Sequence, residues 1–94
     1  MDLQTEITRL TRETTEIKQS IRELNNNISS IEKNETYIKN SKNIQDKIRI
    51  PRNEYYDVIN KDWELHRLYK SLDKLETRLD VKNKKLEKYN KKDT

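Results

Sequence analysis

The 94-residue chain is strongly polar, because 40% of its residues are charged and only 30% are hydrophobic, with a net charge of +4. So few hydrophobic residues exclude a thick, layered core but can fill a narrow seam between long helices. The absence of Cys excludes disulfides and thiolate metal sites, and no hydrophobic run approaches the ~20 residues of a transmembrane helix. We therefore expect a soluble cytoplasmic protein, and the Lys-, Ile- and Asn-rich composition suggests an AT-rich genome, such as that of a low-GC bacterium or its phage.

Residues 3–38 carry a heptad pattern, in which hydrophobic residues recur alternately three and four positions apart. The members of this first seam are Leu3, Ile7, Leu10, Ile17, Ile21, Leu24, Ile28, Ile31 and Ile38. Such spacing is typical of a coiled coil. Thr14 and Glu35 occupy seam positions, where a polar residue can set the register at a cost in stability. Asp2 is a candidate N-cap of the helix.

Beyond Ile38 the hydrophobic stripe shifts by one residue, because Ile44 is in phase with Tyr37. This shift favours either a local rotation of one helix or a helix end near residues 40–43. We expect the first helix to span about residues 2–49, with 40–43 as the place where it can kink.

Residues 50–53 form the clearest turn signal, because Pro51 disfavours helix in the residue before it and lacks a backbone donor. A second helix is expected from about residue 53 to 90, with Asn53 as its cap and a frayed tail at 91–94. Its seam consists of Val58, Leu65, Leu68, Leu72, Leu75, Leu79, Leu86 and Tyr89. Three acid-before-base pairs four residues apart support this helix, namely Asp57/Lys61, Asp80/Lys84 and Glu87/Lys91.

Two seams of similar length flank one turn, which predicts an all-α antiparallel helical hairpin in one domain, residues 1–94. Folding back at the turn would place Ile28 beside Leu75 and Ile17 beside Leu86. The acidic edge of the first seam, Glu6 and Glu13, would then face the basic residues Arg78, Lys85 and Lys92. A parallel dimeric rod is the alternative, since Ile at a and Leu at d positions also suits parallel dimers. A lone hairpin buries one seam only, so we expect association with itself or a partner into a bundle.

A second stripe follows the other side of the second helix, where residues three or four positions apart lie on one face. Its candidate protein-binding residues, flanking tyrosines included, are Tyr55, Tyr56, Ile59, Trp63, His66 and Tyr69. This stripe either covers Ile44 and Ile48 in a local core at the turn or forms an exposed aromatic contact for a partner, since Trp and Tyr are typical hot-spot residues.

The only charge run consists of Lys82, Lys84, Lys85, Lys88, Lys91 and Lys92. These lysines can contact nucleic-acid phosphates or an acidic protein patch, or they can form a solvated helix end favoured by the helix dipole. A single histidine, His66, is too few for a metal or catalytic site, and no Gly-rich phosphate loop is present. We expect no enzyme activity, no cofactor and no small-molecule substrate.

The leading hypothesis is a small non-catalytic coiled-coil protein that binds another protein. Its size and composition suit a phage or mobile-element accessory protein that inhibits or scaffolds a larger complex. A nucleic-acid-binding protein that uses the lysine-rich end is the first alternative, and a purely structural, self-assembling coiled coil is the second. The expected partners are therefore another protein or a second copy of the chain, with nucleic acid as the alternative and no membrane.

Overall fold

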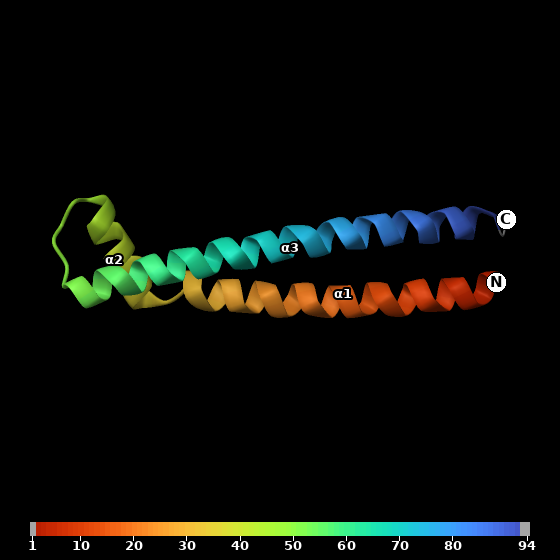
Figure 1. Cartoon of the computed structure of the whole chain (residues 1–94), viewed down its shortest axis with the longest axis horizontal. Helices are drawn as coiled ribbons and strands as arrows, with labels where there is room; N and C mark the ends of the chain where they lie inside the picture. The colour runs from red at the N-terminus through yellow and green to blue at the C-terminus, as the bar shows by residue number, and fades with distance from the viewer. Residues whose placement is uncertain (1, 93–94) are drawn as a thin grey trace.

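The computed structural model describes residues 2–92, with side chains up to Tyr89, and these residues form three α-helices and no strand. The helices are α1 (Leu3–Glu32), α2 (Glu35–Gln45) and α3 (Arg52–Lys92). The long helices α1 and α3 lie antiparallel (Figure 1). The end of the molecule where α2 lies is named the closed end, and the end where α1 begins and α3 ends is named the open end. The molecule measures 64 × 17 × 17 Å. The predicted all-α antiparallel hairpin is confirmed.

The first seam packs as its heptads predict over most of α1. Asp2 caps the helix, because its side chain accepts a hydrogen bond from the Gln4 amide at 3.3 Å. Leu10 and Ile28 are buried. Thr14 is also buried at its seam position, and its hydroxyl donates to the Thr11 carbonyl at 2.8 Å. That bond removes the cost of an unsatisfied polar group in the seam.

The expected continuous helix over residues 2–49 is wrong, because the chain breaks at residues 33–34. The Asn34 amide donates to the Ile31 carbonyl at 3.1 Å, while its side chain accepts from the Tyr37 amide at 2.9 Å. Asn34 therefore ends one helix and caps the next, which is the role that Asn side chains favour. The possible kink or helix end at 40–43 is not found there, since these residues lie inside α2. The new helix direction leaves Ile38 50% exposed.

The end of α2 is closed by a Schellman motif, in which two amides bond back to carbonyls of the last turn. The Ile48 amide donates to the Asn43 carbonyl at 2.7 Å, and the Lys47 amide donates to the Ile44 carbonyl at 3.1 Å. Lys47 adopts the left-handed conformation, with φ of 61°. Glycine is the usual residue there, but this chain contains none.

The last helix begins at Arg52, so the predicted cap at Asn53 is wrong. The Pro51 carbonyl accepts from the Tyr55 amide at 3.0 Å, which places Asn53 inside the first turn. Two predicted ion pairs are confirmed on α3, Asp57–Lys61 at 2.9 Å and Asp80–Lys84 at 3.1 Å. The third, Glu87 with Lys91, and the expected frayed tail involve residues outside the described side chains, although α3 itself extends to Lys92.

Polar contacts between helices reveal the register of the hairpin. Tyr69 on α3 donates to the Glu32 carboxylate at the end of α1, at 2.9 Å to Oε2. The predicted neighbours Ile17 and Leu86 are wrong, because Ile17 shares a groove with Val81 instead. The prediction assumed a symmetric turn at Pro51, whereas α2 forms a separate arm at the closed end. The register along α1 and α3 is therefore shifted by more than one helical turn at the open end.

Candidate protein-binding surface

The aromatic stripe of α3 lies at the surface near the closed end. Trp63 is 63% exposed and Tyr56 is 55% exposed. Ile48, which the stripe was expected to cover in the alternative interpretation, is itself 54% exposed. Side chains that are this exposed do not form a local core between the stripe and Ile48. Side chains of this size leave a considerable hydrophobic area in contact with water.

A shallow hollow of about 370 Å³ lies on the outer side of α3. Its lining residues are Ile59, Asp62, Trp63 and His66. The Trp63 and His66 rings meet edge to face, with centroids 6.2 Å apart. Asp62 accepts a hydrogen bond from the Tyr37 hydroxyl, which joins α2 to α3 and raises the pKa of Tyr37. The hollow thus has an aromatic wall and one carboxylate already used in the fold.

A second hollow, of about 500 Å³, lies at the closed end itself. It is lined by Ile44, Lys47, Ile48, Arg49, Ile50, Arg52, Tyr55 and Tyr56. The rings of Tyr55 and Tyr56 are 5.9 Å apart with an interplanar angle of 67°. The loop residues of this hollow were not among the predicted site residues. Their signal was present in the sequence as the alternation of basic and hydrophobic residues from Lys47 to Arg52.

The predicted contact residues therefore divide into three groups. Ile59, Trp63 and His66 line the outer hollow, and the adjacent tyrosines 55 and 56 line the closed-end hollow. Tyr69 lines neither hollow. Its hydroxyl is bonded to the Glu32 carboxylate, which raises the pKa of Tyr69 and ties α3 to the end of α1. Tyr69 thus contributes to the hairpin itself.

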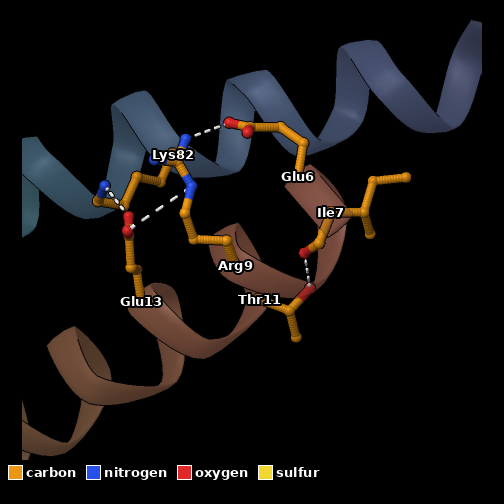
Figure 2. Close-up of polar contacts among 6 residues, drawn as sticks. All are labelled: Glu6, Ile7, Arg9, Thr11, Glu13 and Lys82. Carbon is orange, nitrogen blue, oxygen red and sulfur yellow. Dashed lines mark hydrogen bonds and ion pairs between the residues drawn. The ribbon is translucent and has the colours of Figure 1, made fainter. Parts of the chain in front are cut away.

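The lysine run lies at the opposite end of α3 and is partly neutralised by carboxylates. Lys82 pairs with Glu13 across the hairpin, which lowers the pKa of Glu13, and Lys84 pairs with Asp80. Figure 2 shows Arg9 of α1 and Lys82 of α3 both directed at Glu13, with the Arg9 Nε atom 4.0 Å away.

Among the described side chains, Arg78 and Lys85 form no ion pair with the expected acidic edge, although Glu13 and Arg78 line one hollow, and the expected partner Lys92 lies outside these side chains. Glu13 uses Lys82 of α3, and Glu6 binds Arg9 of its own helix. Lys85 and Lys88 are exposed, whereas the side chains of Lys91 and Lys92 lie outside the described ones. The lysine-rich end thus offers fewer free charges than its sequence suggests.

Within residues 2–92, no helix combines the length and hydrophobicity required to span a bilayer. The same residues contain no group of three metal-ligating side chains suited to a metal ion. No protein-family model, curated protein or solved structure matches this chain.

Proposed function

We propose that this chain is a small, non-catalytic protein-binding module and that its contact surface is the aromatic face of the closed end, formed by Tyr55, Tyr56, Ile59 and Trp63. The observation that carries the proposal is the 63% exposure of Trp63 beside a hollow. Trp and Tyr dominate the binding energy of many interfaces, because they bury a large area with few rotatable bonds.

The shape of the surface supports a protein partner. Trp63 lines the outer hollow, so that a partner can cover the exposed ring while its own side chains enter that hollow and the neighbouring one beside Tyr55 and Tyr56. Both hollows are open to solvent, as expected for contact with another surface and unlike a pocket that encloses a small ligand. A fully buried aromatic side chain covers about 150–250 Å², and more than half of the Trp63 surface is still available for such a contact.

The rod shape suits an accessory role in a larger complex. The aromatic face lies at one end of a molecule 64 Å long, and the two termini lie at the other. Such a module can occupy a site on a larger protein while the rest of the rod extends away from it. We propose a cytoplasmic phage or mobile-element protein that inhibits or scaffolds a larger assembly. The pairing of Lys82 and Lys84 with carboxylates makes nucleic acid the weaker alternative.

The test is capture of partners from native extract by the intact chain and by the double variant Tyr56→Ala/Trp63→Ala. We expect the double variant to lose the proteins that the unmodified chain captures, and to bind the purified partner at least about tenfold more weakly. The matched control is Glu64→Ala, an exposed residue next to Trp63 that lines neither hollow. Circular dichroism checks that helicity is preserved. Equal capture by the double variant would reject this surface.

A further inference from the structure

A groove runs along one edge of the α1–α3 pair, in the half of the hairpin nearer the termini. It consists of two adjoining hollows of about 420 and 540 Å³, and Arg78 lines both. Its hydrophobic floor contains Ile17 and Leu24 from α1, and Leu75 and Val81 from α3. The groove is separate from the aromatic face and lies on other turns of α3.

The two walls of the groove carry opposite charge. The acidic wall belongs to α1 and contains Glu13, Glu16 and Glu23. The basic wall belongs to α3 and contains Lys74, Arg78 and Lys82. Glu13 and Lys82 pair with each other across the hairpin (Figure 2). The other four side chains are exposed, and within the described residues none of them forms an ion pair.

The seam beneath this groove is incompletely covered. Among the hydrophobic residues of the described chain, only Leu10, Ile28 and Val58 are buried. The floor residue Val81 is 49% exposed, and the other floor residues are half-buried. Two helices cannot enclose a seam on every side, whereas four helices can. The groove is therefore a face that further helices would complete.

We propose that the occupant of this groove is a second copy of the same chain, related by a two-fold axis parallel to the long axis of the hairpin. This rotation places α1 of each copy over α3 of the other. Each acidic wall then meets a basic wall. A two-fold axis across the hairpin would instead place α1 on α1 and bring the acidic walls together, which like-charge repulsion disfavours.

The register of the hairpin supports the same arrangement. A two-fold axis along the rod keeps every residue at its own height. Glu23 of α1 and Lys74 of α3 line one hollow from opposite walls, and Glu16 and Arg78 line the other in the same way. In the dimer, Glu23 therefore lies level with Lys74 of the second copy, and Glu16 lies level with Arg78 of the second copy. Two such pairs, each present twice, flank a shared hydrophobic floor.

The product is a four-helix bundle in which every neighbouring pair of helices is antiparallel. Both closed ends lie at the same end of the bundle, so two aromatic faces are presented together. This inference depends on the edge groove and not on the proposed function. Dimerisation can therefore fail while the aromatic face still binds its partner, and the reverse also holds.

Sedimentation equilibrium tests the proposal, and we expect the unmodified chain to reach twice its mass of 11.5 kDa. Glu16→Lys/Glu23→Lys and Lys74→Glu/Arg78→Glu should each weaken dimerisation at least about tenfold, because four attractive pairs become repulsive. An equimolar mixture of these two double variants should regain the dimer, and so should the variant that carries all four changes. The control Arg22→Glu/Lys70→Glu reverses two exposed charges outside the groove and should leave dimerisation unchanged.

Energy transfer between copies tests the orientation. The chain has no Cys, so Asn53→Cys gives one labelling site at the closed end. Copies labelled with donor and acceptor should show strong transfer in the proposed dimer, whereas the reversed arrangement separates the labels by much of the 64 Å length. A monomer at all concentrations, dimerisation unaffected by charge reversal, or a dimer without transfer would each overturn the proposal.

Discussion

Replacement of Lys47 by glycine is expected to stabilise the hairpin. Lys47 is the residue with positive φ in the Schellman motif that ends α2, and its φ is 61°. A side chain with a Cβ atom is crowded against the following carbonyl in this conformation, whereas glycine has no such contact. The amide of Lys47 already forms its hydrogen bond to Ile44 at 3.1 Å, so the substitution preserves the backbone pattern.

The magnitude follows from two opposing terms. The left-handed conformation costs an L-residue about 1–2 kcal/mol, which glycine avoids. Glycine loses about 0.4–1 kcal/mol more in conformational entropy on folding. The free energy of unfolding should therefore rise by about 0.5–1 kcal/mol. For a chain of this length, such a gain raises the melting temperature by about 2–8 °C.

The assay is thermal and urea unfolding followed by circular dichroism, at one fixed protein concentration because the proposed dimer would add a concentration-dependent contribution to stability. The matched control is Lys39→Gly, an exposed position inside α2. There the same replacement should destabilise by about 1 kcal/mol, since glycine is a poor helix former. Opposite signs at the two positions are the expected result. A loss of stability in Lys47→Gly would show that this residue is not left-handed in solution.

Two further predictions concern the seam and its polar contacts. Leu10→Ala should lower the free energy of unfolding in urea by about 2–5 kcal/mol, because Leu10 is only 1% exposed. Leu3→Ala should cost far less, because Leu3 is 38% exposed. Lys82 lowers the pKa of Glu13 below its usual value near 4.5. The Glu13–Lys82 pair therefore contributes to stability fully above pH 4.5, and this contribution is lost as the pH falls through the lowered pKa. Glu13→Gln should flatten this acid limb of the stability curve. Tyr37 and Tyr69, with pKa values raised above 10.0, should cause a loss of stability at alkaline pH as each deprotonates, and equal curves for the unmodified chain and its Phe variants would contradict this.

The hairpin could be predicted because its signals are periodic and long. Hydrophobic residues at heptad spacing identify a helix and its buried face from any single sequence. The lone Pro51 marked the turn, and Asp2 was recognised as a cap from its side-chain chemistry. Even Thr14 was identified correctly as a polar residue within the seam, and the structure shows the Thr11 carbonyl that satisfies its hydroxyl.

The break at Asn34 could not be placed from the sequence, because its signal competes with several others. This chain is rich in Asn, and Asn residues at 25–27, 40 and 43 carry the same intrinsic tendency to end or cap a helix. Which of them does so depends on where tertiary packing can tolerate a break. The shift of the hydrophobic stripe after Ile38 was recognised, but the possible helix end was placed at residues 40–43, whereas the chain breaks at 33–34.

The exposure of the aromatic stripe could not be predicted for the same reason. A stripe on the outer side of α3 is buried or exposed according to where α2 lies, and the break at Asn34 decides that. Because α2 binds α3 through Tyr37 and Asp62, it leaves Trp63 at the surface. In the arrangement of α2 that follows this break, the largest side chain of the protein lies at the surface and not in a core.

Self-association through the edge groove does not account for the exposed Trp63. The groove is lined by residues 71–82 of α3, whereas Trp63 lies beyond them toward the closed end and lines a different hollow. A dimer that buries the groove therefore leaves the aromatic face of each copy exposed, and it presents the two aromatic faces at the same end of the bundle. Binding to a partner with two adjacent sites would then gain from effective concentration, whereas binding to a single site would not. Glu16→Lys/Glu23→Lys should accordingly weaken capture of a two-site partner but leave single-site binding unchanged. Trp63→Ala should weaken binding to both kinds of partner without affecting the dimer.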